Sequence, residues 1–236
     1  MMHKTDKREV LIGVENLKKD FVIGNETIHA LRGIDLEIMA QEFLVIFGPS
    51  GCGKSTLLNI ILGLDRPTHG KIRISDRDIF TLSDDGRGLY RSRKIGMVHQ
   101  MPYWVKTLTV LENIAMPLII RGLKQKSATE RARQVVIELG IEELSDHYPT
   151  QLSGGQQQRA GVARAIVADP WIVIADEPTG NLDSKGAQEV IDMLSNLNKL
   201  QKKTIILVTH NEDYWEIGTR RIEMKDGKII KDINHG

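Results

Sequence analysis

Cysteine is nearly absent from this sequence of 236 residues: Cys52 is the single one, so no disulfide can form within one chain. We expect this of a cytosolic protein, because thiols stay reduced in that compartment. Excess charge is also lacking, since 32 Lys and Arg side chains against 31 Asp and Glu leave a formal net charge of +1. This balance provides no overall electrostatic attraction to nucleic acid or to an anionic membrane surface.

Long hydrophobic runs are missing as well. The most apolar segments, residues 43–47 and 171–175, are far shorter than the roughly 20 residues that span a bilayer. Residues 1–8 are charged but lead into no apolar segment, so we expect no export signal. With 41% hydrophobic and 27% charged residues, the chain can bury a core, and we expect a soluble globular protein.

The first third of the sequence predicts strands followed by a helix. Alternating side chains between about residues 10 and 38, with turn signals at Gly24 and Gly33, predict a peripheral antiparallel sheet. The apolar run 43–47 stops at a glycine-rich loop, and a helical pattern follows over 54–64. This arrangement predicts a buried parallel strand that leads through a loop into a helix.

The middle of the chain has a different character. From about residue 84 to residue 168 strand-like runs almost vanish, and Ser127 and Glu130 predict a capping box at the start of an amphipathic helix. Buried-strand patterns return at 172–175 and 204–208, separated by another helical pattern. We therefore predict a single α/β domain with a mixed, largely parallel sheet and an N-terminal antiparallel β-subdomain. Its core comprises residues 1–83 and 169–236, and a helical subdomain is inserted at 84–168.

A phosphate-binding loop pattern follows the strand predicted at 43–47. Its glycines let backbone N–H groups converge on phosphate oxygens, Lys54 reaches the outer phosphates, and the Ser55 hydroxyl ligates Mg²⁺. A chance glycine-rich turn is the alternative, and the strand before and the helix after disfavour it. We interpret Cys52 as a bystander in this loop rather than a nucleophile. The residues expected to contact the nucleotide here are Gly48, Pro49, Ser50, Gly51, Cys52, Gly53, Lys54, Ser55 and Thr56.

Two adjacent carboxylates, Asp176 and Glu177, end the apolar run that starts at Ile172. Strand alternation points the two side chains in different directions, so one can hold Mg²⁺ while the other acts as the general base toward the attacking water. We assign the metal to Asp176 and the general base to Glu177. A solvated strand end would be the preferred interpretation of an isolated pair, but the phosphate loop reverses that preference.

A second anion-binding helix terminus is predicted at Ser153, Gly154, Gly155 and Gln156. Ser153 and Gln156 have capping-box spacing, and the glycines expose backbone amides at the start of the helix. This segment resembles the signature motif of ABC ATPases, and the resemblance covers nearly the whole chain. It implies the ABC-type core of a P-loop NTPase, and hydrolysis of ATP with Mg²⁺ as cofactor.

Four further residues match the motifs of this family in order. Phe21 resembles the aromatic residue that stacks on adenine, although it could also be a core residue. Gln100 resembles the glutamine that contacts Mg²⁺ and couples to the helical subdomain. Asp183 matches a loop of the family and could equally be an N-cap of the next helix. His210 resembles the switch histidine at the γ-phosphate, whereas a lone His there would more often be a turn residue.

The resemblance also implies partners. In the family, ATP lies between the phosphate loop of one protomer and the residues that match Ser153–Gly155 in the other, so we expect a head-to-tail homodimer. We further expect a separate transmembrane permease that holds the chain at the cytoplasmic face of the plasma (inner) membrane, and no nucleic acid. Residues 108–118, 153–159 and 175–183 resemble the macrolide-export, lipoprotein-release and cell-division subgroup, which favours an exporter or a substrate-extrusion or mechanotransmission system.

The main alternative is a soluble ABC ATPase of DNA repair or translation. The sequence lacks the long heptad coiled coil, the Cys-rich zinc insertion and the second cassette that such proteins carry. A phosphate-loop kinase would leave the signature motif, Gln100 and His210 without a role. Tyr103 and Trp104 follow Gln100, and they either anchor a helix of the permease or fill the core of the helical subdomain.

Overall fold

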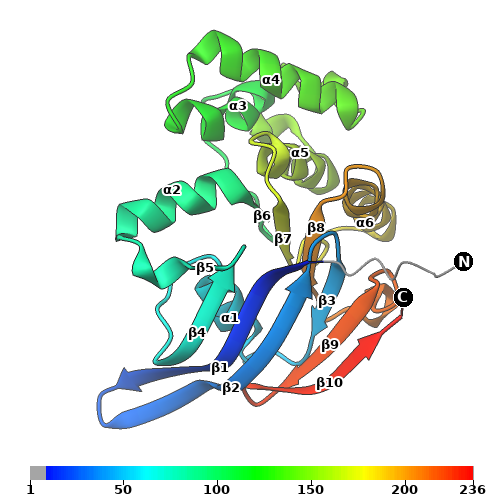
Figure 1. Cartoon of the computed structure of the whole chain (residues 1–236). Helices are drawn as coiled ribbons and strands as arrows, with labels where there is room; N and C mark the ends of the chain where they lie inside the picture. The colour runs from blue at the N-terminus through cyan, green and yellow to red at the C-terminus, as the bar shows by residue number, and fades with distance from the viewer. Residues whose placement is uncertain (1–8, 236) are drawn as a thin grey trace, which may run out of the picture.

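The computed structural model describes residues 9–235, so the charged segment 1–8, to which the expectation about an export signal applies, lies outside the described residues. Two sheets form its framework (Figure 1). The smaller sheet is antiparallel, with the strand order β2-β1-β4-β5. Its strands are β1 (Val10–Ile23), β2 (Glu26–Met39), β4 (His69–Ile74) and β5 (Arg77–Asp78).

The turn predicted at Gly24 is confirmed, and the turn predicted at Gly33 is wrong. β1 and β2 form a long hairpin that reverses at Gly24 and Asn25. Gly33 lies inside β2 with φ of +89°, where the β1–β2 register shifts by one residue. Glycine tolerates that backbone conformation, and the extra residue makes a β-bulge rather than a chain reversal.

The larger sheet has six strands in the order β10-β9-β3-β8-β7-β6. All neighbouring pairs are parallel except β9 and β10. Every residue of β3 and β8 is buried, as expected for strands that are covered on both faces. The strands are β3 (Phe43–Phe47), β6 (Ile95–Val98), β7 (Ile172–Asp176), β8 (Thr204–Val208), β9 (Arg220–Lys225) and β10 (Lys228–Asn234).

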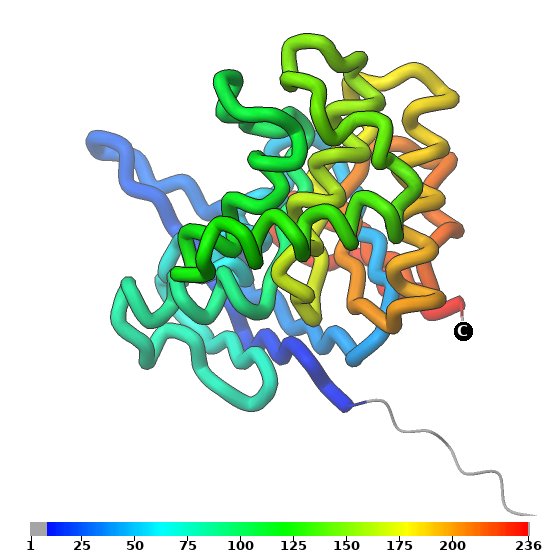
Figure 2. The backbone as a smooth tube through the Cα atoms, turned by 90° about the horizontal axis from the view of Figure 1, so that it is seen from above, coloured from blue at the N-terminus to red at the C-terminus, as the bar shows by residue number. Residues whose placement is uncertain are grey.

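The helices divide between the two faces of the larger sheet (Figures 1 and 2). Helix α1 (Lys54–Ile61) shares one apolar cluster with the antiparallel sheet and one face of the parallel strands. A second cluster joins the opposite face to the remaining core helices. These helices are α3 (Val110–Ile120), α4 (Gln125–Glu138), α5 (Gly154–Ile166) and α6 (Ser184–Lys199). Helix α2 (Asp84–Lys94) and the 3-10 helices Ile79–Thr81, Glu142–Leu144, Pro149–Gln151 and Glu212–Tyr214 complete the structure.

The predicted fold class is confirmed: an α/β domain with a largely parallel sheet, an antiparallel sheet and additional helices. Strand β6 belongs to the parallel sheet although it lies inside the span 84–168 predicted as helical. Helix α4 begins at Gln125, so the capping box predicted at Ser127 is wrong. The Ala128 N–H donates a 3.0 Å hydrogen bond to the Lys124 carbonyl, so Ser127 lies within the first turn of the helix and not at its N-cap.

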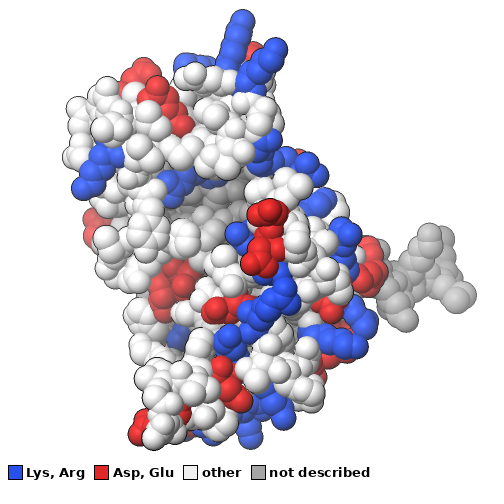
Figure 3. All heavy atoms as spheres, turned by 90° about the vertical axis from the view of Figure 1, so that its left-hand side faces the viewer, with Lys and Arg blue, Asp and Glu red and all other residues white. Residues whose placement is uncertain are grey.

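Surface charge is mixed on the face shown in Figure 3, where Lys and Arg alternate with Asp and Glu. A hollow separates the upper and lower parts of the molecule in the same view. Among the described helices, none combines the length and the apolar character that a membrane span needs.

Candidate functional site

The glycine-rich loop joins β3 to α1 as predicted, and its conformation depends on glycine. A Cβ atom at Gly48 would lie 2.2 Å from the Met224 carbonyl oxygen, and one at Gly53 would lie 2.6 Å from that of Ala30. Gly53 is also the N-cap of α1, with φ of 106° and no side chain that caps the helix. The first N–H groups of α1 therefore lack a side-chain cap, an arrangement suited to an anion.

The ammonium group of Lys54 lies over this loop. Its Nζ donates hydrogen bonds of 2.6 Å to the Gly48 carbonyl and 3.0 Å to the Pro49 carbonyl. The Cys52 thiol is buried, with Sγ at 3.9 Å from the same Nζ, and it packs into the apolar cluster beneath the loop. The positive charge of Lys54 is thus fixed by the backbone of the loop that it is expected to serve.

One cavity of about 570 Å³ brings the loop together with both carboxylates that were predicted from the sequence. Residues from β2 and from the β9–β10 turn close its other side, and nothing in the sequence pattern indicated them. From the loop and α1 the lining residues are Ser50, Gly51, Gly53, Lys54, Ser55 and Thr56; from elsewhere they are Ile28, His29, Ala30, Arg32, Asp176, Glu177, Asp226 and Gly227.

Asp176 lies at the end of β7 and is half-buried in this cavity. Burial raises the pKa of its carboxyl, the negative charge of Glu177 raises it further, and Lys54 partly opposes the shift. The described residues contain no cluster of three or more His, Cys, Asp or Glu side chains that could hold a metal. Mg²⁺ fits this donor set, because it is usually bound by one or two protein oxygens together with phosphate oxygens and water. Asp176 and Ser55 are the residues that would hold it.

Glu177 and His210 contact each other at the same end of the sheet. Glu177 Oε2 lies 2.8 Å from His210 Nδ1 and accepts a 3.4 Å hydrogen bond from the His210 backbone N–H. Glu177 has φ of 47°, and its N–H donates to the Val208 carbonyl of β8. Its carboxylate therefore turns away from the line of β7, lining both the loop cavity and a smaller cavity that contains His210.

Gln100 and Phe21 are near these cavities but do not line them. Gln100 follows β6, and its side-chain Nε2 would lie 2.8 Å from a Cβ atom at Gly180, in the segment after Glu177. Phe21 pairs across the hairpin with Ile28, which lines the loop cavity. The Phe21 side chain is 37% exposed with Lys19 Nζ 4.8 Å from its ring, so its interpretation as a core residue is wrong.

The predicted signature motif lies in a different cavity of about 380 Å³. Ser153 caps α5 through two hydrogen bonds with Gln156. The Ser153 N–H donates to Gln156 Oε1 at 2.9 Å, and the Ser153 hydroxyl accepts from the Gln156 N–H at 3.3 Å. These bonds confirm the predicted capping box. Asp183 caps α6 in a similar way, with Oδ1 2.8 Å from the Gly186 nitrogen, and lines the same cavity. No lining residue of this cavity lines the 570 Å³ cavity, so one chain does not bring the two groups together.

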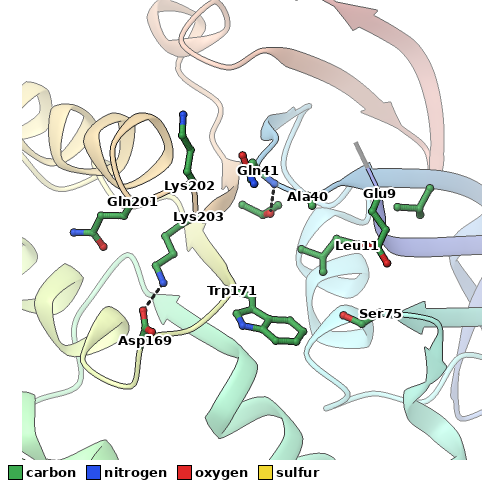
Figure 4. A pocket seen from close by; sticks show the side chains of 12 residues that line it. Glu9, Leu11, Ala40, Gln41, Ser75, Asp169, Trp171, Gln201, Lys202 and Lys203 are labelled. Carbon is green, nitrogen blue, oxygen red and sulfur yellow. Dashed lines mark hydrogen bonds and ion pairs between the residues drawn. The ribbon is translucent and has the colours of Figure 1, made fainter. Parts of the chain in front are cut away.

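A further cavity of about 540 Å³ lies at the other end of the parallel strands (Figure 4). Trp171 and Ser75 face each other across it, and Lys203 pairs with Asp169 at its rim. None of the residues predicted to bind nucleotide lines this cavity. The phosphate loop, both carboxylates and His210 therefore gather at the carboxyl ends of β3, β7 and β8, where ligands bind in open α/β sheets.

The family model described as ABC transporter matches residues 31–180. The lipoprotein-releasing system ATP-binding protein LolD of Geobacter metallireducens is 40% identical over 222 residues, which cover 94% of this chain and 99% of LolD. The macrolide export ATP-binding/permease protein MacB of Vibrio parahaemolyticus is 42% identical over 224 residues, which cover 95% of this chain and 34% of MacB.

A solved structure extends the comparison to three dimensions. It is the dimeric post-hydrolysis state of the ATP-binding cassette MJ0796 of Methanocaldococcus jannaschii, bound to ADP and Pi. The TM-score is 0.87 and the sequence identity 38%, with 95% of this chain and 99% of that chain covered.

Proposed function

Because the chain belongs to the ABC transporter ATP-binding family, we propose that it hydrolyses ATP in a head-to-tail homodimer that drives a separate membrane permease. The observation that carries the dimer is the separation of the two cavities within one chain. The phosphate loop, Asp176 and Glu177 share one, and Ser153–Gly155 line the other. A second copy supplies the missing half of each site, and the dimeric structure of MJ0796 supports this assembly.

Each residue of the composite site has a distinct role in this proposal. Lys54 and the backbone of residues 48–56 bind the phosphates, and Asp176 and Ser55 hold Mg²⁺, which neutralises charge on the phosphate oxygens. Glu177 takes the proton of the attacking water, and His210, which is 2.8 Å away, holds that carboxylate in place. The N-terminus of α5 at Ser153–Gly155 of the partner copy stabilises the charge that develops on the transferred phosphoryl group.

Three further residues, Phe21, Gln100 and Asp183, have roles in the proposed site. Phe21 stacks on the adenine from the exposed hairpin next to Ile28. Gln100 senses the γ-phosphate and Mg²⁺ from the start of the helical subdomain. Asp183 lines the cavity of the signature motif and contacts the partner copy there. Movement is needed to bring Gln100 into the site, because it does not line the loop cavity in the structure of the single chain.

Of the two aromatic residues after Gln100, one fits the role of a permease anchor and the other the role of a core residue. Tyr103 is 76% exposed, whereas Trp104 is partly buried against the core cluster with Arg164 Cζ 4.4 Å from its ring centre. We therefore assign the anchoring of the permease to Tyr103 and a packing role to Trp104. A permease bound at this surface holds the subunit at the cytoplasmic face of the inner membrane.

The relatives narrow the class of transporter. LolD is the ATP-binding protein of a lipoprotein-releasing system, and MacB joins an ATP-binding part and a permease in one macrolide exporter. We propose that this chain drives outward extrusion of a substrate or mechanotransmission by a permease of that kind. The alternative of a soluble ATPase in DNA repair or translation is not favoured, because these relatives are transporter subunits.

Mixing two inactive variants tests the composite site. Lys54→Ala removes the phosphate-binding cation, and Ser153→Arg blocks the signature cavity. A mixed dimer contains one site with both defects and one intact site, so the mixture is expected to regain ATP hydrolysis that neither variant has alone. The rate per wild-type molecule should also rise with protein concentration through the dimerisation range. If the mixture is as inactive as its components and the rate does not depend on concentration, the proposed dimer with composite sites is wrong.

A further inference from the structure

Gln158 has a fully buried polar side chain, and it has no role in the proposed steps of ATP hydrolysis. It lies on α5, five residues after Ser153, and is 1% exposed. Its Nε2 donates a 2.8 Å hydrogen bond to the main-chain carbonyl of His99. His99 directly precedes Gln100, so this bond joins the signature helix to the segment that carries the proposed γ-phosphate sensor.

Two other residues on the same stripe of α5 contact the chain just beyond Gln100. A Cβ atom at Gly161 would lie 3.4 Å from the Pro102 ring, which places the two backbones close together. Arg164 Nη1 donates to the Tyr103 carbonyl at 2.5 Å. Positions 158, 161 and 164 recur every three residues and so lie along one side of the helix. Residues 99–103 are therefore held along α5, and Gln158 is the contact closest to Gln100 in sequence.

The helix that provides this contact begins at Ser153. Five residues of α-helix correspond to about 7.5 Å, so Ser153 and Gln158 are little more than one hydrogen-bonded turn apart on the same helix. A displacement of Ser153 is therefore transmitted to the segment before Gln100 through Gln158. In the proposed dimer, Ser153 acts on the nucleotide bound by the partner copy, whereas Gln100 acts on the nucleotide bound by its own chain.

We propose that Gln158 is a positioning residue that couples the two nucleotide sites of the dimer, an inference that rests on the composite sites proposed above. Closure of one site on Ser153 sets the position of Gln100 in the other through the bond from Gln158 to His99. The carbonyl of His99 would lose its donor if Gln158 were replaced by an apolar side chain, and the segment would then be free to move relative to α5. The role differs from catalysis, because Gln158 contacts only the backbone next to Gln100.

The test compares Gln158→Met with Asn198→Leu. Both changes remove a side-chain amide that ties a helix to a distant carbonyl, since Asn198 Nδ2 donates to the Gln41 carbonyl at 2.9 Å. Asn198 lies on α6 and lines none of the cavities that contain the nucleotide-binding residues. The measurements are the ATP concentration dependence of hydrolysis, the affinity for ATP and the thermal midpoint.

We expect wild type and Asn198→Leu to hydrolyse ATP with positive cooperativity, their Hill coefficients lying between one and roughly two, the number of sites. Gln158→Met is expected to lose this cooperativity and about tenfold in kcat, with ATP affinity unchanged within about twofold. A purely structural role would lower the thermal midpoint and leave the Hill coefficient of the folded fraction unchanged, and that result would overturn the proposal.

Two further outcomes are decisive. If Gln158→Met does not fold, Arg164→Met is measured instead, because it removes the second hydrogen bond to the same segment. Reduced cooperativity in Arg164→Met supports the coupling. Wild-type cooperativity in Arg164→Met overturns it. If the wild type itself lacks cooperativity and the mixed Lys54→Ala and Ser153→Arg variants stay inactive, the composite site fails and this inference fails with it. Failure of the inference alone leaves wild-type cooperativity and the regained activity of the mixture intact.

Discussion

Replacing Glu177 by Gln separates binding of ATP from its hydrolysis. The substitution keeps the size of the side chain and an oxygen that can accept hydrogen bonds from His210, whose Nδ1 and N–H lie 2.8 and 3.4 Å from Glu177 Oε2. It removes the negative charge and the proton acceptor. General bases typically contribute 10²–10⁴-fold to a rate, so we expect kcat to fall by at least about a hundredfold, or roughly 2.7 kcal/mol.

The same substitution should strengthen the binding of Mg-ATP. The charge of Glu177 is the second-largest cause that raises the pKa of Asp176, and its removal makes Asp176 easier to ionise and to place on Mg²⁺. Phosphate release measures kcat, and gel filtration with ATP and Mg²⁺ is expected to show a stable dimer. Turnover within a few-fold of wild type would refute the role of Glu177, and a monomer under saturating Mg-ATP would refute the closed composite site.

Four other substitutions test packing, docking and charge. Trp104→Ala should lower the thermal midpoint without affecting permease capture per folded molecule. Tyr103→Ala should weaken capture of the permease in a pull-down and leave the midpoint unchanged. The reverse result would show that Trp104 is the anchor and Tyr103 the packed residue. The bond from Lys203 lowers the pKa of Asp169, so its stabilisation exists above the unfolded pKa and is lost as pH falls through the folded one. Asp169→Asn should therefore cost up to about 1 kcal/mol at neutral pH and nothing in acid, as chemical denaturation at several pH values would measure. Gly96→Ala would place a Cβ atom 2.3 Å from a carbonyl oxygen of α5, and calorimetry is expected to show destabilisation by about 1–3 kcal/mol or more; an unchanged midpoint would contradict that contact.

Local patterns were sufficient to predict the residues that sit at strand ends and helix starts. The loop around Lys54, the carboxylates at the end of β7 and the capping box at Ser153 each combine an apolar run with an adjacent turn or cap, and the structure places them at those boundaries. Register and packing determine the rest. His29 and Arg32 reach the loop cavity because the antiparallel sheet folds over α1, which no periodicity in β2 indicates.

The predictions that were wrong or left open also depended on register and packing. Gly33 carries a turn signal, but a bulge accommodates its positive φ inside a strand. Ser127 has capping-box spacing, but the hydrogen bond from the Ala128 N–H to the Lys124 carbonyl starts α4 earlier and leaves Ser127 inside it. Tyr103 and Trp104 are adjacent aromatics that the sequence cannot distinguish, whereas in the structure Tyr103 is exposed and Trp104 packs against the core cluster and Arg164.

The strand order has a consequence for the synthesis of the protein. β3, which carries the phosphate loop, has β8 and β9 as its neighbours in the sheet, and both are made more than 150 residues later. Contacts so distant in sequence must wait until the chain that joins them has been translated. A nascent or truncated chain that stops before Thr204 contains the whole phosphate loop and both carboxylates, yet the strand that supports the loop has no partner on either side. Such fragments cannot assemble the nucleotide cavity, so incomplete copies of the chain are unable to hydrolyse ATP.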